Sequence, residues 1–265
     1  MDTLVSYTGP EDTADGSARL TLDSPHNRNA LSSRLVAQLH AGLRDAAADP
    51  KVRVVVLGHT GTTFCAGADL SEASGGPDAG PGELAADRAR EMAALLRAIV
   101  ESPRPVIAAV NGHVRAGGMG LVGACDIAVA GPASTFALTE ARIGVAPSII
   151  SLTLLPKLSA RAAARYYLTG EKFGAAEAAE IGLITLAVEN TADVQATVAG
   201  LVADLRLGSP QGLAASKALT TAAVLAGFDR DAERLSVASA RMFVSEEARE
   251  GMLAFLQKRP PSWAG

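Results

Sequence analysis

The sequence predicts an α/β protein in which a mostly parallel sheet is followed by a helical C-terminal region. Two observations lead to this fold class. Up to about residue 130, apolar runs of strand length alternate with amphipathic helical segments, a rhythm that implies crossover connections between parallel strands. After about residue 147, nearly every segment with regular apolar spacing has the period of a helix.

The elements of the first half follow from apolar spacing and from breaker residues. Leucines at positions 31, 35, 39 and 43 predict a helix over residues 31–48. A β-branched run predicts a buried strand at residues 51–58, where Gly58 begins a loop. The same criteria predict a helix over residues 84–100 and strands over residues 105–110 and 127–130. Residues 71–82 are rich in Gly, Pro and Ser, so we expect a mobile segment there.

The second half is predicted to be helical. The expected helices cover residues 160–168, 175–181, 194–205, 211–219, 229–243 and 246–257. Because short helices need a packing partner to be stable, a second subunit could cover some of them. We therefore divide the chain into a core with the candidate site, residues 1–200, and a helical region for oligomerisation, residues 201–265.

Composition excludes several classes of protein. No apolar run of the 265 residues reaches membrane-spanning length, and the N-terminal residues lack the pattern of a signal peptide, so we expect a cytoplasmic location. Two cysteines are too few for a disulfide framework, and the four histidines show no metal-ligand spacing. A net charge of −4 without a basic stripe argues against nucleic acid as a partner.

Two turns made of small residues are the most informative feature of the chain. The first spans residues 64–70 and reads FCAGADL, and the second spans residues 111–120 and reads NGHVRAGGMG. Each follows an apolar run directly. Because Ala and Gly leave the backbone accessible to a ligand, the pair predicts two backbone N–H groups that donate to a single oxygen atom.

An ordered set of motifs resembles the crotonase (enoyl-CoA hydratase/isomerase) superfamily over nearly the whole chain. Besides the two turns, the set comprises residues 26–31 (HNRNAL), 105–112 (PVIAAVNG), 125–127 (CDI), 136–140 (FALTE), 143–144 (IG), 168–170 (LTG), 175–183 (AAEAAEIGL) and 250–259 (EGMLAFLQKR). The resemblance implies a crotonase-type spiral of ββα units with a helical C-terminal lobe for trimerisation. It also implies a homotrimer or a homohexamer.

The resemblance assigns roles to individual residues as well. Members of the superfamily bind acyl-CoA thioesters, and their oxyanion hole is carried over onto the N–H groups of Ala66 and Gly117. Glu140 matches a catalytic carboxylate of the family. The residues predicted to bind the substrate or its CoA are Cys65, Ala66, Gly67, Ala68, Asp69, Leu70, Gly117 and Gly118. We expect no metal, and no cofactor apart from the CoA that belongs to the substrate.

Two positions depart from the family pattern. Hydratases of the family typically use a second glutamate three residues after the oxyanion-hole glycine, where this chain has Gly120. An aspartate used by some isomerases falls at or near Ser148. Glu140 is therefore the acid/base that remains, and a single carboxylate can still shuttle a proton or activate water. The glycine and residues 142–147 (RIGVAP) resemble bacterial methylglutaconyl-CoA hydratase-like members.

These features predict a lyase that hydrates a 2-enoyl-CoA. One alternative is an enoyl-CoA isomerase that uses Glu140 as a proton shuttle, and another is a non-catalytic acyl-CoA-binding relative, which Gly120 would favour. Residues 118–123 match the dinucleotide-binding pattern GxGxxG, which raises an NAD-dependent oxidoreductase as a further alternative. However, only a very short helix fits between the strands that flank the pattern. The role of Arg115, as a subunit contact or an anion contact, stays open.

Overall fold

The computed structural model describes residues 2–13, 15–69, 72 and 81–265. The segment 71–82, predicted to be mobile, lies mostly outside these residues. Within the described part of the chain, no helix combines the length and the apolar character needed to cross a membrane.

The larger sheet has six strands, and most of its pairs are parallel, as predicted. Its order is β1 (Val5–Thr8), β2 (Ser17–Leu22), β3 (Val54–His59), β5 (Val106–Val110), β7 (Ile127–Ala130) and β10 (Leu186–Ala187). The β1–β2 pair is antiparallel, and all other neighbours are parallel. The predicted strands at residues 51–58, 105–110 and 127–130 are thus confirmed, although β3 begins at Val54 and ends at His59.

A smaller sheet has the order β4 (Thr63–Cys65), β6 (His113–Arg115), β8 (Thr135–Ala137) and β9 (Phe173–Gly174). The first three strands are mutually parallel. Each follows a strand of the larger sheet, so the chain alternates between the two sheets as β3–β4, β5–β6 and β7–β8. A helix comes after the first two pairs, α3 (Pro81–Glu101) and α4 (Gly117–Ala124). This is the ββα repeat that the sequence predicts.

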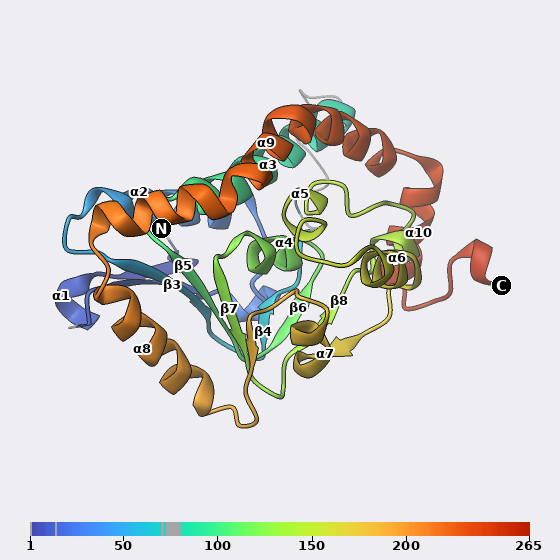
Figure 1. The fold of residues 1–265 in the computed structure, drawn as a ribbon. Helices are drawn as coiled ribbons and strands as arrows, with labels where there is room; N and C mark the ends of the chain where they lie inside the picture. Colours follow the sequence, from blue (N-terminus) through green and yellow to red (C-terminus); the bar gives the residue numbers. More distant parts are fainter. Residues whose placement is uncertain (1, 14, 70–71, 73–80) are drawn as a thin grey trace.

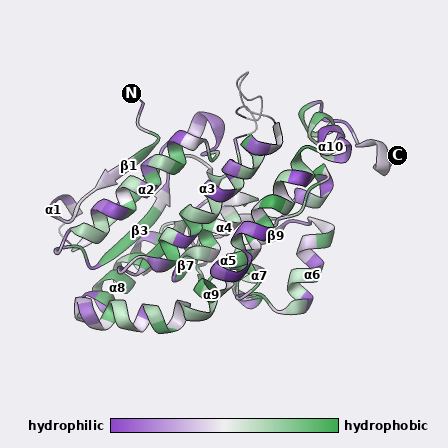
Figure 2. Ribbon diagram, turned by 90° about the horizontal axis from the view of Figure 1, so that it is seen from above, coloured by the Kyte–Doolittle hydropathy of each residue, from purple (hydrophilic) through white to green (hydrophobic). Residues whose placement is uncertain are grey.

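Helices cover both faces of the larger sheet (Figure 1). Side chains alternate along a strand, so Val55 and Leu57 of β3 enter the main core with residues of α2 (Ser33–Ala48) and α3. Val54 and Val56 face the opposite way and pack against three valines of α8 (Asp193–Arg206), which are Val194, Val198 and Val202. Seen from above, hydrophilic and hydrophobic residues alternate along α2, as expected for a helix with one buried face (Figure 2).

The C-terminal half is mostly helical, as predicted, but it also contains the short strands β9 and β10 and the short helix α5 (Ser151–Leu154), which were not predicted. Its other helices are α6 (Ala160–Thr169), α7 (Ala175–Glu180), α8, α9 (Pro210–Phe243) and α10 (Glu246–Leu256). Elsewhere in the chain, short helical segments are α1 (Pro10–Thr13) and the 3₁₀ turns η1 (Pro25–Asn27) and η3 (Glu140–Ile143), and the 3₁₀ turn η4 (Ser262–Ala264) lies near the C-terminus. The two helices predicted at residues 211–219 and 229–243 are one continuous helix, α9, which lies along α3 (Figure 1). Tertiary packing on α3 overrides the weak helix propensity of residues 220–228.

Candidate functional site

Three parallel strands of the smaller sheet bring the predicted site residues to one edge. Gly67 comes two residues after β4, Gly117 two residues after β6, and Glu140 three residues after β8. These strands are neighbours, with Cys65 paired to Val114 and the end of β6 paired to the end of β8. Because parallel strands end at the same edge of a sheet, segments far apart in the sequence meet there.

In the first turn, the N–H groups of Ala66, Gly67 and Asp69 are engaged, whereas that of Ala68 has no acceptor among the described residues. The Ala66 N–H donates to the Arg28 carbonyl oxygen at 3.1 Å, so it cannot serve a ligand while that bond exists. This bond contradicts the predicted role of Ala66 as a donor. Among the described residues, the Ala68 N–H has no acceptor, although its neighbours Gly67 and Asp69 are both bonded to Leu31.

The loop before α2 explains why the Ala66 N–H is bonded whereas the Ala68 N–H is not. Arg28 and Asn29 adopt left-handed backbone conformations, with φ of 58° and 53°. The buried Asn29 side chain donates to the Thr60 and Thr63 carbonyls, at 3.1 and 2.8 Å, and accepts from Ser24 N at 2.7 Å. These bonds fix the Arg28 carbonyl beside the first turn. The sequence shows the polar residues, but not where that carbonyl points.

The second turn lies against the first. The Gly117 N–H begins α4 and has no acceptor within the described residues. A Cβ built on Gly67 would lie only 3.4 Å from the Gly117 nitrogen. The two turns are therefore in direct contact, and each carries a donor with no acceptor in the described part of the chain, at Ala68 and at Gly117.

Cys65 and Gly118 hold the two turns together from behind. The Cys65 side chain is fully buried, and its Sγ accepts the Gly67 N–H at 3.4 Å. A Cβ on Gly118 would lie 2.7 Å from the Cys65 Cβ, so only glycine fits there. Burial raises the pKa of the Cys65 thiol to about 12, which leaves it neutral and unreactive. Leu70, also predicted to bind substrate, lies outside the described residues.

Glu140 is a buried acid. It begins the 3₁₀ turn η3 directly after the short stretch that follows β8, and its relative exposure is 8%. Its Oε2 atom is buried and has no hydrogen-bond partner in the described part of the chain. Burial raises the pKa of this carboxyl to about 7. An acid with a pKa near neutrality can give or take a proton at physiological pH.

The site thus combines the Ala68 and Gly117 N–H groups with the buried acid Glu140, and comparison with known proteins identifies the family. The sequence profile of the enoyl-CoA hydratase/isomerase family matches residues 12–265. The chain belongs to this family.

Individual relatives agree with this assignment. A crystal structure of an enoyl-CoA hydratase from Mycobacterium avium is 71% identical, with a TM-score of 0.91, and the match covers 99% of this chain and 100% of that one. A Bacillus subtilis (strain 168) protein named "Probable enoyl-CoA hydratase" is 31% identical over 249 residues, 94% of this chain and 95% of its own. The 1,2-epoxyphenylacetyl-CoA isomerase of Escherichia coli (strain K12) is 31% identical over 256 residues, with the same coverage.

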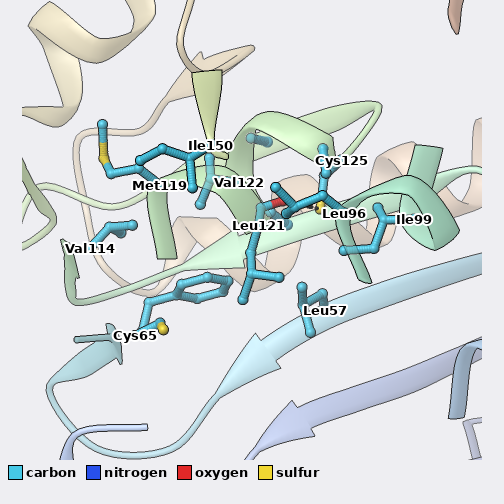
Figure 3. Close-up of a cluster of buried hydrophobic side chains, with 14 of the residues drawn as sticks. Leu57, Cys65, Leu96, Ile99, Val114, Met119, Leu121, Val122, Cys125 and Ile150 are labelled. Carbon is cyan, nitrogen blue, oxygen red and sulfur yellow. Dashed lines mark hydrogen bonds between the residues drawn. The ribbon is translucent and has the colours of Figure 1, made fainter. Parts of the chain in front are cut away.

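The chain differs from the hydratase pattern of this family at Gly120, and the structure gives a steric reason. A Cβ on Gly120 would lie 2.5 Å from Ile150 Cγ2, 3.0 Å from Ile150 Cβ and 3.2 Å from Leu96 Cδ1. Figure 3 shows Ile150 and Leu96 in the buried cluster around α4. The volume that a side chain at position 120 would need is thus filled by an apolar wall. The hydroxyl of Ser148, at the other departing position, donates to the Ala146 carbonyl at 3.4 Å.

The pattern GxGxxG is explained by packing within α4. A Cβ on Gly123 would lie 2.8 Å from Leu154 Cδ2, and Gly118 and Gly120 meet Cys65 and Ile150 as described. All three glycines are buried. They allow a helix of eight residues to pack closely on its neighbours, and nothing in this arrangement favours a dinucleotide.

Two hydroxyl groups near Glu140 were not predicted from the sequence. The Tyr167 and Ser151 hydroxyls lie 3.2 Å apart, and Ser151 also donates to the Pro147 carbonyl at 2.6 Å. Burial raises the pKa of Tyr167 to about 12, and the nearby Glu140 charge adds to this rise. Neither residue belongs to a motif, because α5 and α6 bring them to the site only through tertiary packing.

Proposed function

We propose that this protein hydrates a 2-enoyl-CoA thioester. In this proposal the N–H groups of Ala68 and Gly117 bind the thioester oxygen, and Glu140 is the acid/base. The observation that carries the proposal is the meeting of these three groups at one edge of three parallel strands. Among the described residues, the two donors have no acceptor, and the buried Oε2 atom of Glu140 has no hydrogen-bond partner.

The chemistry needs such an arrangement. Glu140 takes a proton from water, and the water oxygen forms a bond to the β-carbon of the enoyl group. The electron pair of the double bond then moves to the α-carbon and the thioester oxygen, which gives an enolate. The two N–H groups stabilise this charge more strongly than they stabilise the neutral thioester. Return of the proton from Glu140 to the α-carbon completes the addition. One donor of this kind contributes about 3 kcal/mol.

A second candidate is the isomerisation of an enoyl-CoA, which a specific observation favours. The apolar wall of Ile150 and Leu96 excludes a second carboxylate at position 120. Glu140 alone could move a proton from one carbon of the acyl chain to another, with the same enolate and the same two donors. The relation to an acyl-CoA isomerase at 31% identity adds to this candidate.

We further propose that the protein acts as a homotrimer or homohexamer in the cytoplasm, without a metal or a separate cofactor. The motivation for an oligomer is the set of exposed apolar side chains on α10 and the tail that follows it, which are Leu253, Phe255, Leu256 and Trp263. The likeness of residues 142–147 to methylglutaconyl-CoA hydratase-like proteins suggests that carboxylated acyl groups should be among those tested.

The experiment is a screen of short, long and carboxylated 2-enoyl-CoA thioesters. We expect at least one to lose its conjugated double bond and to gain the mass of one water molecule. Conversion to a product of unchanged mass with a shifted double bond would instead identify an isomerase. Tight binding without turnover of any thioester would identify a non-catalytic relative.

A further inference from the structure

The backbone at Ala116 has a conformation that normally requires glycine. Its φ is 45° and its ψ is −119°, a region in which the Cβ of an L-residue crowds its own backbone. Glycine adopts this region without steric cost, and glycines stand at positions 117, 118 and 120 directly after it. An alanine in this strained state calls for a physical reason.

The Ala116 methyl group lies against the first turn. A Cβ built on Gly67 would be 2.7 Å from the Ala116 Cβ, so the methyl packs directly on the Gly67 backbone. On the far side, a Cβ on Gly117 would be 2.8 Å from Leu31 Cδ1. The second turn thus contacts Gly67 through Ala116 and Leu31 through Gly117, so a shift of either turn would change these contacts.

The contact between Ala116 and Gly67 lies directly before both free donors in the chain. The free N–H of Ala68 belongs to the peptide unit that follows Gly67. The free N–H of Gly117 belongs to the peptide unit that follows Ala116. The backbone angles of Gly67 and Ala116 set the directions of the two donors. The Ala116 methyl group therefore fills the contact between these two residues.

We propose that Ala116 is a positioning residue whose methyl group is a spacer that sets the distance and the angle between the Ala68 and Gly117 donors. The inference rests on the proposed function, because it concerns the same oxyanion site. Without the methyl group, glycine at position 116 would keep the turn but would let the two peptide units approach each other and rotate. Misaligned donors would stabilise the enolate less, whereas binding of the thioester elsewhere would change little.

The test is Ala116→Gly, compared with Ala116→Ser, which keeps the Cβ. For Ala116→Gly we expect kcat to fall by about tenfold or more, with KM within about threefold of the wild type. The melting temperature should not fall, because relief of strain offsets the greater freedom of glycine in the unfolded chain. Ala116→Ser should retain most of the wild-type kcat.

Ala124→Gly is the matched control, because it removes a buried methyl group from the far end of the same helix. It should lower the melting temperature and leave kcat unchanged, the opposite pattern. An unchanged kcat in Ala116→Gly would overturn the proposal. Equal losses in the Gly and Ser variants would also overturn it, as would a fall in melting temperature as large as that of the control. Absence of turnover in the wild type would instead refute the proposed function.

Discussion

Glu140 is buried more deeply than is usual for a glutamate, and the cost of that burial has a defined pH dependence. Its pKa is about 7 in the folded protein, against an ordinary value of 4.5. The folded state thus binds a proton that the unfolded state has already released between these two values. Stability is therefore greatest below about pH 4.5 as far as this group is concerned, and it is lost as the pH rises through about 7.

This predicts the pH dependence of the Glu140→Gln variant, whose neutral amide carries no such cost. At pH 8 the variant should be more stable than the wild type, by roughly 3 kcal/mol at most. At pH 4.5 the difference should largely vanish. Urea denaturation at both pH values measures the two free energies of unfolding. A variant that is less stable than the wild type at pH 8 would show that Glu140 is not a strained, desolvated acid.

The apolar wall at Gly120 leads to a second prediction at this scale. Gly120→Ala should destabilise the fold by about 1–3 kcal/mol, because the new methyl group would overlap Ile150. Ile150→Ala removes the atoms that would be overlapped. The double variant should therefore be more stable than the sum of the two single changes predicts, by about 1 kcal/mol. Additive effects in this cycle would mean that Ile150 does not exclude a side chain at position 120.

The limits of sequence reasoning are visible in single residues. The motif FCAGADL showed that a backbone donor was present, but it pointed to Ala66, whose N–H is taken up by the Arg28 carbonyl. Which of the N–H groups in such a turn stays free depends on a carbonyl some 40 positions earlier in the chain. Spacing within the motif carries no information about it. Glu140 and Gly117 were predicted from the family resemblance, and the structure brings both to the edge at which β6 and β8 end.

Among the elements, α9 is held to its neighbours by an ion pair whose lysine is buried. Lys217 donates to Asp126 Oδ2 at 2.7 Å, and also to the Ile99 and Arg104 carbonyls at 2.9 and 3.1 Å. Burial lowers the pKa of Lys217 even though Asp126 opposes this change. The pair ties the first turns of α9 to the end of α3 and to the segment that leads into β5. The sequence contains no sign of this contact, because its partners are about 90 or more residues apart.

We therefore predict a large effect for Lys217→Met. The change should lower the free energy of unfolding by about 3 kcal/mol or more, because it removes the positive charge beside the Asp126 carboxylate and the Lys217 donor to two backbone carbonyls. The Val106 N–H, which also donates to Asp126 Oδ2 at 2.7 Å, would remain. Ser216→Ala, at an exposed neighbouring position, is the control and should change stability by less than about 0.5 kcal/mol. Denaturant titrations measure both. Equal stabilities of the two variants would contradict the structural role of Lys217.

The strands also differ in how well they could be predicted. The strands β3, β5 and β7 are apolar runs buried on both faces, so they stand out in the sequence. The strands β4, β6 and β8 each have three residues, too few to show an alternating pattern. Yet these short strands carry the site. Their existence follows from the ββα spiral as a whole, which the resemblance implied and local patterns did not.

For the molecule as a whole, the exposed apolar side chains near the C-terminus predict a contact with a second subunit. Phe255 and Leu256 on α10 are 62% and 66% exposed, high values for large apolar side chains that lie next to each other. Light scattering should give the mass of a trimer or a hexamer. Phe255→Asp should shift that mass toward the monomer, whereas Lys172→Asp, a change at another exposed position, should not. A stable wild-type monomer at working concentration would contradict this prediction.

In the proposed function, one carboxylate performs the chemistry while backbone donors hold the thioester. The most direct test measures both turnover and thioester affinity in Glu140→Gln, with Glu180→Gln as a control at an exposed position. The account predicts a fall in kcat of about a hundredfold or more in Glu140→Gln, with the dissociation constant for the CoA thioester within about threefold of the wild type. The control should match the wild type in both. Undiminished turnover in Glu140→Gln would show that another residue is the base and would contradict the account.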